Sequence, residues 1–290
     1  MPAVSVVIPL FDKARFLAQT LDGVRAQTFR DWELLVVDDG SRDGGPGIAR
    51  AFAAGEPRAR MLRHPGGAHL GAFASRLLGA RRARAPVIAL LDADDVWERD
   101  YLARHLRRWR SVAARGVGLS YGPAVYWFPE RPRRRGFTHA MPSARAKIFA
   151  PGELLQNFLS SGHNTEPRTS ASLLRREAML AAARFSRAAS KNPVYEDNFL
   201  MWSVAAGWPV AVHPGAWVRY RQRRTPGSKP GAYRPDQRRA ERAFLPVILS
   251  DLARRAPGRA LPSPEVSSAD AGYFFERVPA ALRRLAEART

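Results

Sequence analysis

Short apolar runs alternate with amphipathic helical patterns over the first 125 residues of the chain. The runs at residues 4–8 and 87–91 consist almost entirely of apolar side chains, as in strands buried inside a sheet. Between them, apolar residues recur at helical spacing, for example at Leu17, Leu21 and Val24. Strands that alternate with helices form right-handed βαβ units. The sequence therefore predicts an α/β fold, with a mainly parallel sheet flanked by helices.

The pattern changes at about residues 125 and 233, and we divide the chain there into three parts. Residues 126–233 begin with an irregular connection rich in proline and arginine, followed by shorter helical and strand-like runs. Residues 234–290 hold two helical patterns that a proline-rich linker separates. We expect residues 1–125 and 126–233 to form one domain, and residues 234–290 to form a helical C-terminal extension.

The composition excludes several classes of protein. The chain contains no cysteine, which rules out disulfides, thiolate metal sites and cysteine nucleophiles. No stretch approaches the roughly 20 consecutive apolar residues that a membrane-spanning helix needs. Residues 1–10 read as a strand rather than as a signal peptide, because no basic segment precedes an apolar one. These features predict a cytoplasmic protein.

The formal net charge is +21, and it comes almost entirely from arginine. Such a charge can attract nucleic acid, anionic lipid or phosphate-bearing substrates, or it can simply reflect arginines spread over a solvated surface. The two densest arginine runs, at residues 131–135 and 219–224, are not interleaved with aromatic residues in the way that a base-stacking surface is, since Tyr220 is the only aromatic residue in either. Nucleic acid is therefore disfavoured as a partner. Peripheral contact with the anionic inner face of a membrane is favoured over it.

Acidic residues directly follow three of the predicted strands. Asp12 follows the first strand, residues 38–39 (Asp-Asp) follow the second, and residues 92–95 (Asp-Ala-Asp-Asp) follow the strand at 87–91. Ligands of open α/β sheets bind just beyond the carboxyl ends of the strands. Carboxylates gathered there repel one another unless a cation or hydrogen-bond donors compensate. The pattern predicts Mg²⁺ or Mn²⁺ bound through carboxylate oxygens, with a diphosphate supplying further ligands.

Each acidic cluster has a simpler interpretation when it is taken alone. Residues 38–41 (Asp-Asp-Gly-Ser) are typical of a turn, and residues 92–95 could cap the helix that follows. Because both clusters stand at strand ends, about 55 residues apart, we favour one shared functional site. No glycine-rich loop follows the first strand, which excludes a dinucleotide fingerprint and a P-loop. An anionic ligand would therefore be bound mainly through metal and side chains.

Several motifs resemble those of a known family. They are residues 5–9 (SVVIP), 27–29 (QTF), 32–34 (WEL), 36–41 (VVDDGS) and 90–95 (LLDADD). In this order and spacing, over roughly the first 115 residues, they resemble a family-2 glycosyltransferase with the GT-A fold and its DxD motif. The resemblance extends more weakly to residues 195–197 (YED), similar to the family's ED motif, and to Tyr220-Arg221.

The resemblance implies an inverting, metal-dependent glycosyltransferase that uses a nucleoside-diphosphate sugar, with UDP favoured. Residues 1–125 would bind the nucleotide sugar, and residues 126–233 would bind the acceptor and supply the catalytic base. The implied donor-binding residues are Pro9, Leu10, Asp12, Asp38, Asp39, Arg76, Asp92 and Arg223. Asp94 and Asp95 would bind Mn²⁺ or Mg²⁺, and Asp197 would take the proton from the acceptor hydroxyl. The acceptor would be a glycan or glycolipid in the synthesis of cell-surface polysaccharide or another glycoconjugate.

Two departures from the family pattern bear on the donor site. Family members usually carry Ala-Arg-Asn upstream of the DxD strand, whereas residues 75–77 read Ser-Arg-Leu, so the asparagine contact is missing. A histidine often follows the Tyr-Arg pair, whereas Gln222 and Arg223 follow it here. Arg223 or Arg224 could compensate by pairing with phosphate oxygens. His213 is an alternative ligand, although an isolated histidine beside a strand is more often structural.

Other interpretations remain open. Asp197 could simply place negative charge at the start of a helix. The aromatic run at residues 126–128 is predicted to be a buried strand rather than a platform that stacks on a sugar. A nucleotidyltransferase would also bind a metal through acidic residues, although it would normally carry a glycine-rich basic loop after the first strand. A catalytically inactive binding protein with the GT-A fold is the remaining alternative.

Overall fold

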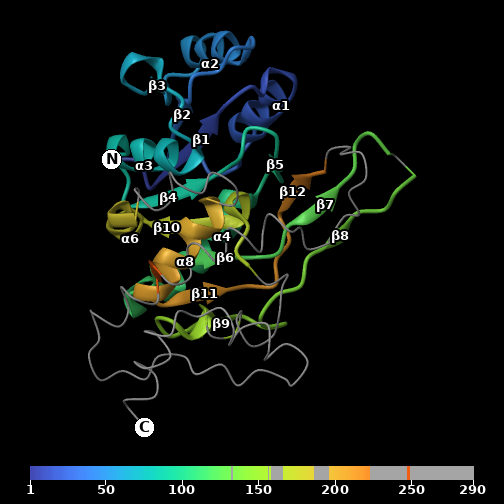
Figure 1. Cartoon of the computed structure of the whole chain (residues 1–290). Coiled ribbons are helices and arrows are strands. Elements are labelled where there is room, and N and C mark those ends of the chain that lie inside the picture. The colour runs from blue at the N-terminus through green and yellow to red at the C-terminus, as the bar shows by residue number, and fades with distance from the viewer. Residues whose placement is uncertain (132, 156, 158–165, 186–195, 223–246, 249–290) are drawn as a thin grey trace, which may run out of the picture.

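The central sheet contains eight strands in the order β3-β2-β1-β4-β10-β6-β11-β9 (Figure 1). The computed structural model describes residues 1–131, 133–155, 157, 166–185, 196–222 and 247–248. The strands of this sheet are β1 (Val4–Leu10), β2 (Trp32–Asp38), β3 (Ala59–Arg63), β4 (Val87–Leu90), β6 (Leu119–Tyr121), β9 (Lys147–Phe149), β10 (Ser172–Arg175) and β11 (Val210–Val212). Residues from both sides of position 125 thus contribute strands to one sheet.

The first four strands form a parallel half of the sheet, with β1 at its centre. β1 pairs in parallel with β2 and β4, and β2 pairs in parallel with β3. β10 then runs antiparallel between β4 and β6. β1 continues through Pro9 to Leu10, whereas the sequence predicts that Pro9 ends the strand. Proline is tolerated there because β1 pairs with β4 only as far as Val7, so no partner on that side uses the missing N–H.

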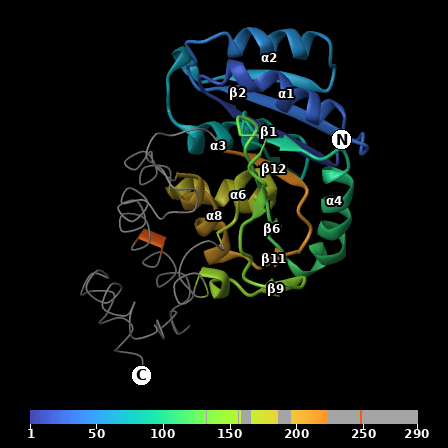
Figure 2. The same cartoon turned by 90° about the vertical axis from the view of Figure 1, so that its right-hand side faces the viewer.

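Helices cover both faces of the sheet (Figure 2). On one face, α1 (Ala14–Arg25), α2 (Gly45–Ala54) and α4 (Tyr101–Val112) pack against a core that includes Val6 and Ile8. On the other face, α3 (Ala72–Arg82), α6 (Arg176–Ala181) and α8 (Glu196–Gly207) pack against a core that includes Val7 and Leu35. Alternate residues of β1 are therefore buried on opposite faces, which explains its unbroken apolar run. The predicted α/β fold is confirmed.

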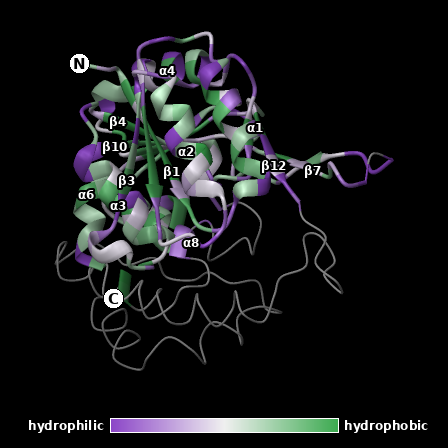
Figure 3. Cartoon of the chain, turned by 90° about the horizontal axis from the view of Figure 1, so that it is seen from above, coloured by the Kyte–Doolittle hydropathy of each residue, from purple (hydrophilic) through white to green (hydrophobic). Residues whose placement is uncertain are grey.

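A second sheet of four strands, in the order β5-β12-β7-β8, extends from the side of the central sheet (Figures 1 and 3). Its strands are β5 (Val96–Trp97), β7 (Val125–Trp127), β8 (Phe137–Thr138) and β12 (Val218–Arg221). β7 confirms the strand predicted around residues 126–128, and Tyr126 is buried in it. The sequence does not reveal the pairing of β12 with β7 and β5, because these segments lie far apart in the chain.

Glu33 is a buried acid near the start of β2, at 0% exposure. Its carboxylate accepts hydrogen bonds from Ser5 Oγ at 2.7 Å, from Arg84 N at 2.6 Å and from Arg60 Nη2 at 3.0 Å. Burial raises the pKa of Glu33, but these hydrogen bonds outweigh burial and hold the pKa below its ordinary value of 4.5. The ionised form of Glu33 therefore stabilises the folded state.

We expect Glu33→Gln to lower the free energy of unfolding by about 2 kcal/mol at pH 7, because the charge-assisted hydrogen bonds to the carboxylate are lost or weakened. A lowered folded-state pKa contributes stability that is complete above the unfolded value and is lost as the pH falls through the folded value. The difference in the free energy of unfolding between wild type and Glu33→Gln should therefore decrease in acid, below about pH 4.5. Urea unfolding at a series of pH values measures it, and a gap that widens in acid would contradict the assignment.

Two predictions fall on residues that the structure describes only in part. The predicted C-terminal extension (234–290) lies outside the described residues, apart from Val247 and Ile248, which are helical. The three-part division of the chain therefore stays a prediction. The sequence also predicts a helix at residues 151–159; of these the structure describes 151–152, which form a turn, and 153–155 and 157, which are helical. Among the residues that the structure describes, no helix is long and apolar enough to cross a membrane.

Candidate active site

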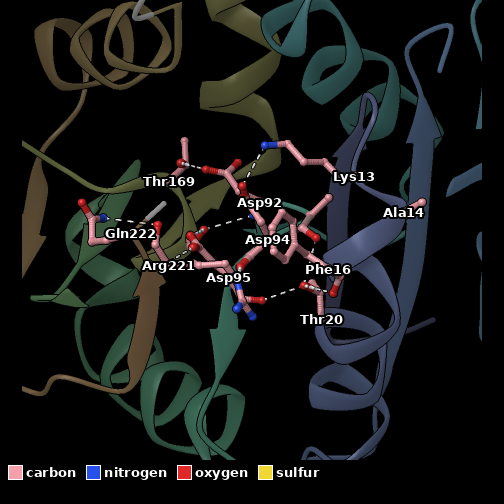
Figure 4. A network of polar contacts seen from close by, with 12 residues as sticks. Lys13, Ala14, Phe16, Thr20, Asp92, Asp94, Asp95, Thr169, Arg221 and Gln222 are labelled. Carbon is pink, nitrogen blue, oxygen red and sulfur yellow. Dashed lines mark hydrogen bonds and ion pairs between the residues drawn. The ribbon is translucent and has the colours of Figure 1, made fainter. Parts of the chain in front are cut away.

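The acidic run at residues 92–95 forms a loop at the carboxyl end of β4, beside the carboxyl end of β1 (Figure 4). Asp95 N donates to the carbonyl oxygen of Asp92 at 3.1 Å, which closes a tight turn. The run leads into β5, and α4 begins only at Tyr101. The alternative interpretation, in which this run caps the next helix, is therefore wrong.

Asp92 and Asp94 each face a cation. Lys13, which lies between β1 and α1, places Nζ 2.7 Å from Asp94 Oδ2 (Figure 4). Arg76 of α3 donates from Nη2 to Asp92 Oδ1 at 2.7 Å, and Thr169 Oγ1 donates to the other oxygen at 2.9 Å. The side chains of Asp92 and Asp94 are 24% and 13% exposed. A ligand can therefore reach both carboxylates, and positive charge already lies beside each of them.

Asp95 points into the protein instead. Ser170 Oγ donates to one of its oxygens at 2.5 Å, and Arg221 N donates to the other at 2.8 Å. Burial, together with the charges of Asp92 and Asp94, raises the pKa of Asp95 well above its ordinary value. Both oxygens are used inside the fold, so the metal-binding role predicted for Asp95 lacks an exposed oxygen. The geometry makes Asp95 a brace for the loop.

We expect Asp95→Ala to lower the free energy of unfolding by about 2–3 kcal/mol, because the Ser170 hydroxyl and the Arg221 N–H lose their acceptor in a buried setting. Asp100→Ala is the matched control, since Asp100 forms an exposed i,i+4 ion pair with Arg104 that is worth about 0.5 kcal/mol or less. Denaturant unfolding of the two variants measures the difference. Equal effects would contradict the bracing role.

Arg221 ties the second sheet to the acidic loop. Its Nε donates to the carbonyl oxygen of Asp94 at 2.6 Å. Its guanidinium carbon lies 4.4 Å from the ring centroid of Trp127 and 4.9 Å from that of Phe16. Arg221 therefore fixes the loop on one side, much as Lys13 and Arg76 contact it on the other. Arg223, which the sequence predicts to bind the donor, lies outside the described residues.

Asp38 and Asp39 hold loops together and have almost no exposed surface, at 0% and 2%. Asp38 accepts from Ser41 N at 3.0 Å, and Arg63 Nε lies 3.0 Å from its other oxygen. Asp39 accepts from two successive backbone N–H groups of the loop at residues 64–71, at 2.8 and 3.0 Å. Both acids thus shape the loops at the carboxyl end of β2.

The residues at the end of β1 also help to hold the loop that follows β2. Pro9 and Leu10 are buried, and the carbonyl oxygen of Leu10 accepts from Asp39 N at 2.8 Å. Asp12 has a left-handed conformation (φ 49°), and its Oδ1 accepts from Arg42 N at 2.8 Å. Of the residues predicted to bind the donor, these three thus lie in or directly after β1, beside the loop that follows β2.

An exposed aromatic surface lies beside these loops. Phe11 stacks on His69 with ring centroids 4.0 Å apart and 22° between the ring planes. Phe11 is 38% exposed. His69 Nδ1 lies 2.8 Å from Asp39 Oδ2, which holds the imidazole in place. The pair offers a flat apolar face to a planar ring, with the carboxylate of Asp39 behind it.

The start of α8 meets the start of α3. Glu196 Oε1 accepts from Ala72 N at 2.5 Å and thereby caps α3. Gly71 has φ 89°, and a Cβ at this position would lie 2.8 Å from the Glu196 carboxylate. Glycine is therefore needed here both for the turn and for the close approach of Glu196. The contact fixes the first turn of α8, which carries Asp197, against the helix that carries Arg76.

Asp197 lies in the first turn of α8, as the sequence predicts, and it shares a charge network with Arg76. Burial lowers the pKa of the Arg76 guanidinium, but the charges of Asp92, Asp197 and Glu196 outweigh burial and raise it. Arg76 Nε and Nη1 are buried and have no hydrogen-bond partner among the described residues. Arg76 is therefore hydrogen-bonded to Asp92 and interacts electrostatically with Asp197, the predicted base.

Comparison with known sequences identifies the family to which the chain belongs. The sequence model of the family described as "Glycosyl transferase family 2" matches residues 5–179, which is more than half of the chain. The chain belongs to glycosyltransferase family 2. The matched span of this family-2 chain runs from β1 to α6, so it contains the acidic loop but not Asp197.

Individual relatives and solved structures agree with this family. Glycosyltransferase AglE of Haloferax volcanii is 30% identical over 131 residues, which are 44% of this chain and 41% of AglE. The chain thus matches less than half of the length of such curated relatives.

The structure of S. aureus TarS 1–349 in complex with UDP matches with a TM-score of 0.62 at 15% identity, covering 98% of this chain and 83% of TarS 1–349. Mannosyltransferase PcManGT from Pyrobaculum calidifontis, solved with GDP-Man and Mn²⁺, matches with a TM-score of 0.57 at 19% identity, covering 99% of this chain and 74% of that one. At these identities the two structures establish the GT-A fold alone.

The acidic loop of the family-2 chain suits a metal that shares its ligands with a bound substrate. Within the described ranges, no group of three or more His, Asp or Glu side chains is placed to hold a metal ion by itself. Lys13 Nζ lies 2.7 Å from Asp94, so this carboxylate already faces a cation. One or two carboxylates completed by phosphate oxygens and water are the usual ligands of Mg²⁺ in such sites. The residues present therefore fit a metal of this kind.

His213, the alternative metal ligand, lies elsewhere. It is buried, stacks on Trp217 with ring centroids 4.6 Å apart, and meets the His105 ring edge-on at 4.5 Å. Its ring contacts are thus aromatic, and the structural interpretation of His213 is favoured.

Sequence reasoning missed several residues of the site. Lys13 carried a usable signal, because it is one of only four lysines and follows the first strand closely. Phe11 directly precedes Asp12, but a single aromatic residue in a loop has no distinctive pattern. Thr169 and Ser170 carried no signal, because their contacts with Asp92 and Asp95 span more than 70 positions of the chain.

Proposed function

We propose that this chain transfers a sugar from a nucleoside-diphosphate sugar to an acceptor hydroxyl, with inversion at the anomeric carbon. The observation that carries the proposal is the pairing of Asp94 with Lys13 and of Asp92 with Arg76 at the carboxyl end of β4. Two reachable carboxylates, each beside a cation, can bind a diphosphate and a divalent metal together. Membership of glycosyltransferase family 2 supports the same reaction class.

UDP is the favoured nucleotide, although the relatives support the wider class of nucleoside diphosphates, since TarS was solved with UDP and PcManGT with GDP-Man. In our proposal the base lies against the Phe11–His69 stack. Asp39 would act from behind by holding His69 in place, while Pro9, Leu10, Asp12 and Asp38 act by holding the surrounding loops. The stacking area supplies binding energy, and the polar groups supply orientation.

Mn²⁺ or Mg²⁺ would be held by Asp94, with Asp92 beside it, and would offset the negative charge that develops on the leaving diphosphate. The presence of Mn²⁺ in the PcManGT structure supports this choice of metal. Asp95 is assigned to bracing the loop. With a metal held by Asp94, the Lys13 ammonium would be free to pair with a phosphate oxygen. Arg76 keeps Asp92 oriented through the reaction.

Asp197 is proposed as the general base. The acceptor oxygen attacks the anomeric carbon while its proton passes to the Asp197 carboxylate, and the bond from the sugar to the diphosphate breaks. The acceptor is proposed to be a glycan or glycolipid, with the cationic protein in peripheral contact with an anionic membrane.

The direct test is a screen of UDP-, GDP- and dTDP-sugars with purified protein and Mn²⁺, in which the release of nucleoside diphosphate is measured with and without glycan acceptors. Metal-dependent release from one donor class is the expected result. If every donor stays intact while the protein remains folded, the inactive binding protein becomes the better account.

A further inference from the structure

A pocket is lined by residues of α4, β6, β11 and β9, elements that Figure 2 shows near one another. Its volume is about 190 Å³. In the sheet order, β10 and β6 separate β11 from β4, so this pocket is distinct from the acidic loop. Its charged and polar lining includes Arg108, Arg115, Ser120, Lys147 and His213.

The pocket is strongly cationic. Arg108, Arg115 and Lys147 line it, and none of its lining residues is acidic. Within the part of the chain that the structure describes, neither arginine forms an ion pair. Lys147 lies 3.0 Å from Glu153, but both side chains are largely exposed and such pairs are weak. Counting only the described residues, the positive charge of the lining is therefore largely uncompensated.

His213 adds a buried polar group to the same wall. The residue is 3% exposed, and neither ring nitrogen has a hydrogen-bond partner among the described residues. Burial and the nearby charge of Arg108 lower the pKa of His213 to about 4, so that its ring is neutral at neutral pH and adds no charge to the lining. Buried polar atoms in native proteins nearly always have a partner, whether protein, water or ligand.

We propose that this pocket binds a single phosphate group, either as free phosphate or as the phosphomonoester headgroup of a lipid. Two guanidinium groups and an ammonium are the groups that recognise phosphate oxygens most strongly. A volume of about 190 Å³ is below the range of about 300–1,000 Å³ that drug-sized ligands occupy, which suits a small anion such as one phosphate group. Because β10 and β6 separate it from β4, the pocket is a site apart from the proposed donor site.

Isothermal titration of the full chain with inorganic phosphate, at constant ionic strength set by chloride, tests the proposal. Arg108→Gln and Arg115→Gln should each raise the Kd for phosphate by about ten-fold, since each removes charge-assisted hydrogen bonds. Arg107→Gln is the matched control, because it removes the same charge from the same helix without lining the pocket. The control should bind phosphate as the wild type does.

Two arms of the experiment separate this site from others. Phosphate should still bind when UDP and Mn²⁺ are present, and Arg108→Gln should leave the response to UDP unchanged. Loss of phosphate binding can therefore be told apart from failure of the proposed donor site.

Flotation with vesicles that contain phosphatidic acid, compared with phosphatidylserine vesicles of equal charge, identifies the source of the phosphate. An advantage for phosphatidic acid that Arg108→Gln abolishes indicates a lipid headgroup, and titration by free phosphate alone indicates the soluble ion. Absence of phosphate binding in the wild type, or equal losses in Arg107→Gln and Arg108→Gln, would overturn the proposal.

Discussion

Asp197→Asn should lower kcat for sugar transfer by roughly 100- to 10,000-fold, the usual contribution of a positioned general base. Asparagine keeps the shape of the side chain but cannot take the proton of the acceptor hydroxyl. The Asp94–Lys13 and Asp92–Arg76 pairs do not include Asp197, so the Kd for the nucleoside diphosphate should stay close to that of the wild type. Steady-state kinetics and calorimetric titration of the same preparation measure the two quantities.

The control for this substitution is Asp100→Asn, which makes the same chemical change at an exposed ion pair with Arg104. It should retain the activity of the wild type. If Asp197→Asn transferred sugar at the rate of this control, Asp197 would have no part in the chemistry, and its position at the start of α8 would reflect only favourable charge at a helix N-terminus.

Asp94→Asn should lower kcat/KM by roughly 100- to 1,000-fold, the effect typical of removing one group that stabilises charge in the transition state. The expected loss has two parts, because the variant holds the metal less tightly and leaves the diphosphate with less compensation. Added Mn²⁺ should tighten nucleotide binding in the wild type and have little effect in the variant. Kinetics over a range of Mn²⁺ concentrations measure both parts.

Asp22→Asn serves as the control for Asp94→Asn, because Asp22 is an exposed acid on α1. The stability of Asp94→Asn should fall by less than that of Asp95→Ala, since the asparagine oxygen can still accept a hydrogen bond from Lys13 Nζ. This separates Asp94 from Asp95, whose replacement should destabilise the fold. A variant with normal Mn²⁺ dependence at position 94 would argue that the metal is held elsewhere.

The parallel half of the sheet could be predicted because its signals are local. The run at residues 4–8 is apolar at nearly every position since β1 is covered on both faces, and the continuous run at 87–91 has the same cause. Parallel strands bring their carboxyl ends to one edge, so the approach of Asp12, Asp38 and the acidic loop to one another followed from the strand assignments alone.

The orientation of side chains within the acidic loop could not be predicted in the same way. Asp94 and Asp95 are neighbours in an acidic run, yet one faces Lys13 and solvent and the other is buried. What decides between them is Ser170 and Arg221, which reach the loop from distant parts of the chain. A pattern of residue types shows that carboxylates gather, but the surrounding donors determine which of them remain open to a ligand.

The same limit applies to Asp38 and Asp39. Their place at the end of β2 followed from the sequence, but their burial depends on Arg63 and on the loop at residues 64–71. That loop contains Gly66, Gly67 and Gly71 in left-handed conformations, which lets it fold back onto Asp39. The second sheet was likewise hidden, because its strands are short and pair over long distances in sequence.

The measurement that tests the central claim most directly is calorimetric titration of the wild-type chain with UDP, GDP and dTDP and with their monophosphates and nucleosides, each with and without Mn²⁺. We predict that one nucleoside diphosphate binds with an affinity that Mn²⁺ increases, and that its monophosphate binds more weakly because it lacks the second phosphate. If none of the three bound, or if the nucleoside alone bound as tightly as its diphosphate without any effect of Mn²⁺, the assignment of Asp92 and Asp94 to a metal–diphosphate site would be contradicted.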